Sequence, residues 1–449
     1  MSSSAPSAPV VRLPVAPRII PRAEHNISRD SISERALKVL YRLKNAGYLA
    51  CLVGGSVRDL LLGREPKDFD VATNARPEQV RELFKNCRLI GRRFRLAHVH
   101  FGNEIIEVAT FRANTLATAS DARVIEEDGR ILRDNVYGTI DDDVWRRDFT
   151  VNALYYNIED FSVIDYVGGM ADIAAGQLRL IGDPDVRYRE DPVRLLRAVR
   201  FAAKLGFRIH PDTETPLHTL GELLDVISPS RLFEEMLKLF LAGKAVQSFE
   251  LLRHYGLFGR LFPEVEESLG EEEAGFPKML LVKALENTDR RLAEDKPVTP
   301  AFLLAALLWA PVQRRTRQYQ AQEHPPAHAA ELAQDDAIAR QIARVAMPRR
   351  FTQMAREIWL LQHPLEQRVA RSVVRWFTHP RFRAGYDFLV LRAEAGEPVR
   401  EAADWWTAFQ QATENTRAEM IAALPQPAPG SGRKRRRRGG RHRHKSAPV

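Results

Sequence analysis

The sequence changes character near residue 185, and this change limits the folds that the chain can adopt. Before it, short segments rich in β-branched and aromatic residues alternate with helical segments. After it, strand patterns disappear and helical spacing with alanine-rich apolar faces dominates, as in residues 192–204, 231–242 and 301–308. Strands mixed with helices, followed by helices alone, are typical of an α+β protein. We therefore predict a mixed-sheet head followed by an all-α neck and body.

Individual elements can be placed along the chain. Helical spacing predicts helices over residues 32–43, 56–62 and 77–84. Strand patterns occur over residues 48–53, 68–72, 96–101 and 105–111, where we predict strands. The longest apolar run, residues 301–310, ends at Pro311 and has about half of the roughly 20 residues that a membrane span needs. It therefore predicts a core helix and no membrane span, whereas residues 314–335, with Pro325-Pro326, predict a loop or mobile insertion.

Composition divides the chain into five segments. They are a disordered leader (1–27), the head (28–170), a helical neck (171–245), a helical body (246–424) and a disordered basic tail (425–449). The leader lacks the apolar region of a secretory signal, although its arginines, with no acid before Glu24, leave a transit peptide as an alternative. Nine Lys or Arg residues and no acid lie between Arg433 and Lys445, which equals the net charge of +9. The rest of the chain must therefore bind polyanions through local patches.

Two cysteines, Cys51 and Cys87, are too few for a Cys-rich zinc site or a disulfide framework. Both have apolar sequence neighbours, which predicts buried reduced thiols and a cytosolic protein.

A glycine pair follows the strand predicted over residues 48–53. Gly54 and Gly55 allow a ligand to approach the backbone closely, and Ser56 is placed to cap the helix that follows. Free N–H groups at a helix start suit a phosphate, and Arg58 in the first turn adds a positive charge. The alternative is an ordinary strand–turn–helix corner without a ligand.

Acidic side chains occur on two predicted strands. Asp68 and Asp70 are two residues apart, so a strand presents both carboxylates on one face, while Phe69 points into the core. Two close carboxylates repel unless a divalent cation offsets their charge. Glu107 is an acid within an otherwise apolar strand and should face a metal, a cation or solvent. A solvent-facing alternation is the alternative for the Asp pair, and an exposed edge is the alternative for Glu107.

Two further blocks combine basic, acidic and amide side chains. The first contains Arg147, Asp148 and Asn152 ahead of an apolar segment, a set suited to polyphosphate and ribose. In the second, Asp191, Arg194 and Arg197 are spaced by three, so they share one helical face and could recognise the edge of a nucleobase. For Asp191 the alternative is a helix N-cap, since proline follows it.

Taken in order, these blocks carry a family resemblance. The chain resembles the class II nucleotidyltransferases of the DNA polymerase beta superfamily, which include bacterial poly(A) polymerases and tRNA CCA-adding enzymes. The matching blocks are GGSVRDLLLG, PKDFDVAT, EVATFR, RRDFTVNAL and REDPVRLLRAVRF. The resemblance covers residues 30–245 by motif and continues more loosely to about residue 420. It implies a palm-like nucleotidyltransferase head.

The resemblance also implies residue roles. The residues that match nucleotide-binding positions are Gly54, Gly55, Arg58, Arg147, Asn152, Asp191, Arg194 and Arg197. The residues that match catalytic, metal-binding positions are Asp68, Asp70 and either Glu107 or Asp148 as the third carboxylate. Two Mg²⁺ ions, with Mn²⁺ as a substitute, are the implied cofactors, and ATP is the implied substrate.

The resemblance favours poly(A) addition, the template-independent transfer of AMP from ATP to RNA 3′ ends with release of pyrophosphate. Residues 89–99 and 231–238 resemble the poly(A) polymerase version of these segments, and a basic tail would bind RNA phosphates. The expected RNA-binding residues are Arg92, Arg93, Arg95, Arg433, Lys434, Arg435 and Arg436. The alternatives are tRNA CCA addition and a catalytically inactive RNA-binding protein on the same fold. We also expect a bacterial cytoplasmic location and a role in RNA decay. Accessory RNA-decay or RNA-chaperone proteins are the expected partners.

Overall fold

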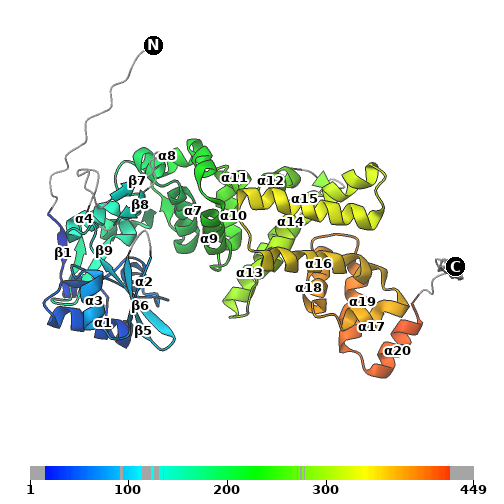
Figure 1. Ribbon diagram of the computed structural model, residues 1–449, viewed down its shortest axis with the longest axis horizontal. Coiled ribbons are helices and arrows are strands. Elements are labelled where there is room, and N and C mark those ends of the chain that lie inside the picture. Colours follow the sequence, from blue (N-terminus) through cyan, green and yellow to red (C-terminus); the bar gives the residue numbers. More distant parts are fainter. Residues whose placement is uncertain are drawn as a thin grey trace, which may run out of the picture. The chain divides into compact units, whose positions relative to one another are not determined.

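The computed structural model describes residues 16–91, 95–113, 123–125, 131–134, 136–270, 272–273, 276–277 and 279–424. The chain forms two compact units that divide between Pro263 and Glu264 (Figure 1). The first unit therefore extends beyond residue 245, where the neck was predicted to end. It does so because helix α10 (Ala245–His254) packs against α7 (Val193–Leu205) and α9 (Pro229–Phe240).

The first unit is built on an eight-stranded mixed sheet with the strand order β1-β10-β9-β2-β3-β6-β5-β4. The strands are β1 Arg18–Ile20, β2 Ala50–Val53, β3 Asp70–Thr73, β4 Cys87–Ile90, β5 Leu96–Phe101, β6 Glu104–Thr110, β9 Leu154–Asn157 and β10 Val163–Asp165. Neighbouring strands are antiparallel except β3 and β6, which are parallel. The four strands predicted from the sequence are confirmed, with shifts of one or two residues at their ends.

Helices cover both faces of this sheet. The helical segments of the head are η1 Arg22–Glu24, η2 Arg29–Ser31, α1 Glu34–Asn45, α2 Gly55–Leu61, α3 Pro77–Leu83, α4 Ile140–Arg146, η3 Thr150–Asn152 and α5 Gly169–Ala175. Helices α1 and α3 lie side by side against one face (Figure 1). The α1 sequence buries Val39, Leu40 and Leu43, whose spacing forms one apolar stripe, and Ser33 caps its first turn.

The two faces of the sheet have separate cores. Leu52, Val71 and Phe69 are buried in the cluster beneath α1 and α3. Cys51 and Ala72, which alternate with them along the strands, belong to the opposite cluster that includes Val144 of α4. Phe69 therefore points into the core, as predicted. Cys51 is a buried free thiol, as expected, whereas the free thiol of Cys87 is only half-buried.

Residues 18–27 are part of the folded head, so the prediction of a disordered leader over residues 1–27 is wrong for this part. Strand β1 pairs with β10 in an antiparallel register. Ile20 and Ile27 are buried in the core with exposed fractions of 2% and 1%. The prolines and serines around Ile20 and Ile27 gave this segment the composition of a disordered leader. Only the pairing of β1 with the distant strand β10 places these two isoleucines in the core.

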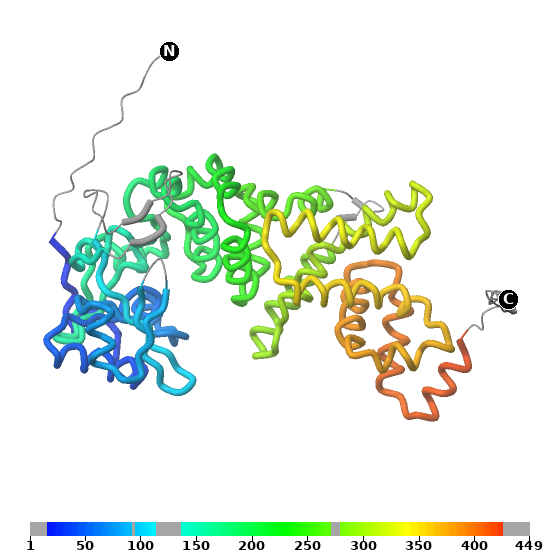
Figure 2. The backbone as a smooth tube through the Cα atoms, in the orientation of Figure 1, coloured from blue at the N-terminus to red at the C-terminus, as the bar shows by residue number. Residues whose placement is uncertain are grey.

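The neck is largely helical, and Figure 2 traces it in green after the blue and cyan strands of the head. Its elements are β11 Gln177–Leu178, α6 Pro184–Glu190, α7, β12 Arg208–Ile209, α8 Pro211–Thr219, η4 Gly221–Val226, α9, α10 and α11 Phe258–Leu261. Strands β11 and β12 form a short parallel pair. The prediction that strands are absent after residue 185 is therefore wrong at β12 and at the two-residue strands over 272–273 and 276–277 of the second unit, because strands this short give no period-two pattern.

The second unit is also helical. Its elements are α12 Pro263–Leu269 at the boundary, β13 Glu272–Glu273, β14 Phe276–Pro277, α13 Leu280–Ala293, α14 Pro300–Ala321, α15 Pro326–Arg344, α16 Arg349–Gln367, η5 Ala370–Ser372, α17 Val373–Phe377, α18 Phe382–Glu394, α19 Arg400–Gln411 and α20 Glu414–Ala422. A small pair of strands, β7 Arg123–Ile125 and β8 Ile131–Asp134, belongs to the first unit. Within the described part of the chain, no helix combines the length and apolar character required to cross a membrane.

The prediction of a loop over residues 314–335 is wrong. Helix α14 continues through Pro311 as far as Ala321, and α15 starts at Pro326. Within this range, Arg315 of α14 forms ion pairs with Glu264 and Asp336. Packing between α14 and α15 stabilises the helix beyond a proline that removes one backbone hydrogen bond.

Candidate active site

The parallel pairing of β3 and β6 brings two acidic residues together. Asp70 is the register partner of Glu107, so the two carboxylates project from neighbouring strands on one face. Glu107 is also opposite His98 of β5, and the His98 Nε2 atom lies 3.3 Å from Glu107 Oε2. Asp68 lies just before β3, which starts at Asp70, and its charge acts on Asp70. Asp68, Asp70 and Glu107 therefore lie near one another on or beside two central strands of the sheet.

The charge state of Asp70 reflects this crowding. Its side chain is exposed at the surface, yet nearby protein atoms reduce its hydration. This partial burial, followed by the negative charges of Glu107 and Asp68, raises the pKa of Asp70 to about 6 despite the opposing charge of Arg147. A site in which two neighbouring carboxylates disfavour the ionisation of Asp70 fits a hard divalent cation such as Mg²⁺, which prefers oxygen ligands and would offset the repulsion.

The glycine corner adjoins these carboxylates. Val53, the last residue of β2, is the register partner of Asp70, and Gly54 follows directly. Gly54 has a φ of +73°, a backbone conformation that other residues adopt only with strain. Ser56 was expected to cap α2, but Gly54 occupies the cap position and the Ser56 hydroxyl donates to the carbonyl of Val53 at 3.1 Å. The cap prediction is wrong because α2 starts one residue earlier, at Gly55.

Arg147 supplies positive charge beside the glycine corner. A Cβ atom at Gly54 would lie 3.7 Å from the Arg147 guanidinium. Arg147 donates to the Tyr155 hydroxyl at 2.8 Å and to Asp143 Oδ2 at 2.9 Å. Despite the burial of the guanidinium, Tyr155 and Asp143 hold the pKa of Arg147 above its usual range. Arg147 is thus a fixed cation between the glycine corner and Asp70.

A buried hydrogen-bonded network joins α7 to α2. Arg197 donates to Asp148 Oδ2 at 2.7 Å, and Asn152 donates to Asp148 Oδ1 at 3.2 Å. The Asn152 side-chain oxygen accepts a bond of 2.5 Å from Arg58, which also donates to Asp59 at 2.8 Å. We call the set Arg197, Asp148, Asn152, Arg58 and Asp59 the α7–α2 network.

The α7–α2 network modifies two expectations. Arg58 is only 2% exposed, and its guanidinium is directed at the side chains of Asp59 and Asn152, so its described contacts are internal. Although burial opposes ionisation of Asp148, Arg197, the Phe149 backbone N–H and Asn152 hold the pKa of its carboxyl below its usual range. Asp148 therefore stays charged within a set of internal donors, which favours Glu107 as the third carboxylate.

Asp191 and Arg194 lie at the start of α7. Asp191 is not a side-chain N-cap, because α7 starts with Pro192 at the cap position and no side chain caps it. Its Oδ2 atom accepts a bond of 2.9 Å from Arg231, whereas its buried Oδ1 atom has no hydrogen-bond partner among the described residues. Buried carboxylate oxygens are rarely left unpaired, so Oδ1 is an acceptor available to a ligand.

The other two residues of the predicted face have internal partners. Arg194 donates to the Arg187 carbonyl at 2.7 Å and to Glu190 Oε2 at 2.9 Å. Arg197 is held by Asp148. Arg194 and Arg197 lie one turn apart on α7, whereas Asp191 precedes this helix in an extended conformation, so the three residues do not share one helical face. Arg197 belongs to the α7–α2 network.

Several residues at the site escaped prediction. His98, Asp143, Tyr155 and Arg231 contact predicted site residues, yet none lies in the blocks that suggested the site. Asp143 lies four residues before Arg147, a spacing that suggests a helical ion pair and was overlooked. His98 and Arg231 depend on strand register and on tertiary packing, which leave no local signal.

The expected RNA-binding residues are mostly outside the described residues. Arg92, Arg93, Arg433, Lys434, Arg435 and Arg436 all lie there. Arg95 is described, and it forms an exposed ion pair with Glu78.

The mixed sheet and its acidic cluster beside a glycine corner define a nucleotidyltransferase head. Three family descriptions match the chain: "Poly A polymerase head domain" over residues 50–179, "Probable RNA and SrmB- binding site of polymerase A" over 206–269, and "Polymerase A arginine-rich C-terminus" over 322–443. The chain belongs to the bacterial poly(A) polymerase I family.

Near full-length similarity supports this membership. The chain is 50% identical to poly(A) polymerase I of Salmonella typhi over 412 residues, covering 90% of this chain and 88% of the relative. It is 47% identical to poly(A) polymerase I of Haemophilus influenzae over 408 residues, covering 90% of each. Among solved structures, the Bacillus stearothermophilus CCA-adding enzyme in complex with CTP aligns with a TM-score of 0.53 and 26% identity, over 88% of this chain and 82% of that one.

Proposed function

We propose that this protein is a polynucleotide adenylyltransferase that adds AMP from ATP to RNA 3′ ends without a template and releases pyrophosphate. The register pairing of Asp70 with Glu107, next to Asp68 and the glycine corner, carries the proposal. High identity to two poly(A) polymerase I proteins supports AMP as the transferred group. The proposal includes a cytoplasmic location and leaves room for RNA-decay or RNA-chaperone partners.

The acidic cluster would hold the divalent ions. Asp68, Asp70 and Glu107 are the proposed ligands, with Mg²⁺ as the expected ion and Mn²⁺ as a substitute. Ions at this position would lower the pKa of the RNA 3′-hydroxyl and offset the charge of the triphosphate.

Other side chains position the nucleotide. The backbone at Gly54 and Gly55 lies beside the Arg147 guanidinium, so the triphosphate can approach main-chain N–H groups and a fixed cation together. Asp191 Oδ1 would accept a hydrogen bond from the exocyclic amino group of adenine, with Arg194 as a neighbouring donor. The network residues Arg58, Asn152 and Arg197 would position these groups relative to one another. The 3′-hydroxyl then attacks the α-phosphorus in line with the departing pyrophosphate.

One assay tests the activity. A generic RNA primer and a tRNA lacking its CCA end are each offered ATP and CTP separately. Long A tails on the generic primer, without use of CTP, are expected. Addition limited to C-C-A on the tRNA would instead identify a CCA-adding enzyme, and no incorporation on either RNA would identify an inactive RNA-binding protein.

Base recognition by Asp191 is tested with Asp191→Ala. We expect kcat/KM for ATP to fall by roughly 10- to 100-fold, because hydrogen bonds to charged groups contribute about 1.5–3 kcal/mol. The measurement is steady-state AMP incorporation at varied ATP. Asp185→Ala changes an exposed acid on α6 and should have no effect. A loss in Asp191→Ala of less than twofold would contradict the assignment.

The basic tail is tested by deleting residues 425–449. The deletion removes nine Lys or Arg residues and no acid, so RNA affinity should fall and become less dependent on salt. AMP incorporation at saturating primer should remain, because every proposed catalytic residue lies before residue 200. Titration of labelled RNA at several salt concentrations gives the slope, and an unchanged slope would mean that other residues bind the phosphates.

A further inference from the structure

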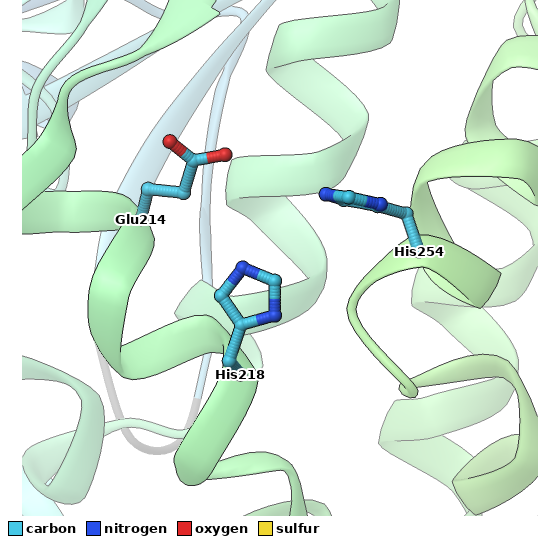
Figure 3. Close-up of side chains that lie close together, drawn as sticks. All are labelled: Glu214, His218 and His254. Carbon is cyan, nitrogen blue, oxygen red and sulfur yellow. The ribbon is translucent and has the colours of Figure 1, made fainter.

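One carboxylate and two imidazoles gather in the neck, outside the candidate active site. Glu214 and His218 lie on α8, and His254 is the last residue of α10. Each offers a metal-ligating atom, and these atoms all lie within 4.8 Å of one another. In Figure 3 the Glu214 carboxylate, the His218 ring and the tip of the His254 ring face a common space.

The fold fixes the part of this cluster that α8 supplies. Glu214 and His218 are four residues apart, so they lie on one face of the helix. The residue before Glu214 anchors the helix: the Thr213 hydroxyl accepts a bond of 3.0 Å from the Leu180 backbone, and its carbonyl accepts one of 3.0 Å from the buried Tyr188. The two ligands therefore have a rigid base.

Tyr255, the residue directly after α10, contacts all three members of the cluster. Its hydroxyl donates to Glu214 Oε1 at 2.7 Å, which orients the carboxylate and leaves Oε2 for another partner. Its ring makes edge contacts with His218 and His254, with centroid distances of 5.0 Å and 4.7 Å. Hydrogen bonds of this kind orient metal ligands in many sites.

The donor set selects a class of metal. Two imidazole nitrogens and one carboxylate oxygen suit Zn²⁺ and related transition metals, whereas Mg²⁺ prefers oxygen ligands alone. Tetrahedral zinc places its donors ~3.3 Å apart, given Zn–N distances of about 2.0 Å. His218 and His254 are exposed, so their side chains can make the short rotation that brings the donors to this spacing.

We propose that Glu214, His218 and His254 form a binding site for Zn²⁺ or a closely related transition metal, which joins α8 to α10. Three protein ligands leave a fourth position for water. Because the metal would bind the folded neck and connect residues far apart in the sequence, it would stabilise the first unit.

The test uses the untagged, full-length protein after treatment with a chelator. Zn²⁺ is titrated calorimetrically with excess Mg²⁺ present to occupy the acidic cluster. We expect one site whose affinity falls in His254→Ala and Glu214→Gln by more than the roughly 10- to 100-fold typical of outer-shell changes. Tyr255→Phe should give a loss within that outer-shell range. Zn²⁺ at about 100 times its Kd should raise the unfolding temperature by on the order of 5 °C, except in His254→Ala.

Three control variants localise the bound zinc. His363→Ala removes an exposed histidine of α16 and should leave affinity unchanged. Asp70→Asn removes a ligand of the acidic cluster, and His442→Ala with His444→Ala removes the histidines of the tail. Equal zinc affinity in wild type and His254→Ala would overturn the proposal and leave the ring contacts as the reason for the clustering. Loss of the site in either of the last two controls alone would also overturn it.

Discussion

Replacing Asp70 with Asn should reduce AMP incorporation by at least about 1,000-fold, because losing a ligand charge removes several kcal/mol of transition-state stabilisation. The substitution keeps the shape of the side chain, so RNA binding should remain nearly unchanged. Single-turnover incorporation into a labelled primer measures the first effect, and a binding titration measures the second. Glu82→Gln, a change at an exposed acid on α3, is the matched control and should retain full activity.

The same variant has a second, independent signature in stability. Burial and neighbouring acids raise the pKa of Asp70 to about 6, so its carboxylate, which is still mostly ionised at neutral pH, reduces the stability of the metal-free fold there. Asp70→Asn should therefore unfold at a temperature no lower than that of the wild type without metal. Mg²⁺ should stabilise the wild type and have little effect on the variant. Polymerisation within tenfold of the wild type would show that Asp70 is not a metal ligand.

Replacing Asp148 with Asn should destabilise the first unit by on the order of 3 kcal/mol, because it leaves the half-buried guanidinium of Arg197 without its charged partner. The unfolding temperature should fall by roughly 10 °C for a unit of this size. Glu107→Gln is the comparison: it should lose activity with little change in stability, since Glu107 is half-exposed and its described side-chain partner is His98. Thermal unfolding and incorporation assays on both variants separate positioning from metal binding.

The stability difference at Asp148 should depend on pH with a defined sign. The pKa of Asp148 is lowered in the folded state, so its carboxylate stabilises the fold above the ordinary Asp pKa of about 3.9. That contribution is lost as the pH falls through the lower, folded-state pKa. The wild type should therefore exceed Asp148→Asn in stability at neutral pH and approach it in strong acid. A constant difference across this range would assign the loss to packing.

Local patterns predicted most of the head. The apolar spacing of α1, the apolar run of β2 and the alternating burial along β5 and β6 are properties of short segments, and the structure confirms them. The position of β3 beside β6 and the parallel pairing of Asp70 with Glu107 cannot be predicted from short segments, because they join residues far apart in the sequence. The sequence therefore indicated acidic strands, whereas tertiary pairing determined which acids meet.

The failed predictions share a physical cause. Residues 18–27 and 314–335 are rich in residues that favour loops when isolated, yet β1 gains a strand partner and α14 gains the packing of α15. Ser56 and Asp191 are suitable caps by residue type, but the helices begin elsewhere because Gly54 and Pro192 already supply the required backbone angles. In each case residues outside the pattern used for the prediction decide the conformation: distant strand and helix partners for residues 18–27 and 314–335, and the neighbouring Gly54 and Pro192 for the two caps.

The α7–α2 network has a consequence for changing the nucleotide preference of this protein. It links Arg197, one turn along the helix that starts near Asp191, to Arg58 beside the glycine corner through buried, mutually dependent contacts. The residues that contact the base and the residues that contact the triphosphate of a bound nucleotide would thus lie at a fixed distance from each other. To change base preference, substitutions should be made at Asp191 and Arg194, and the α7–α2 network should be left unchanged.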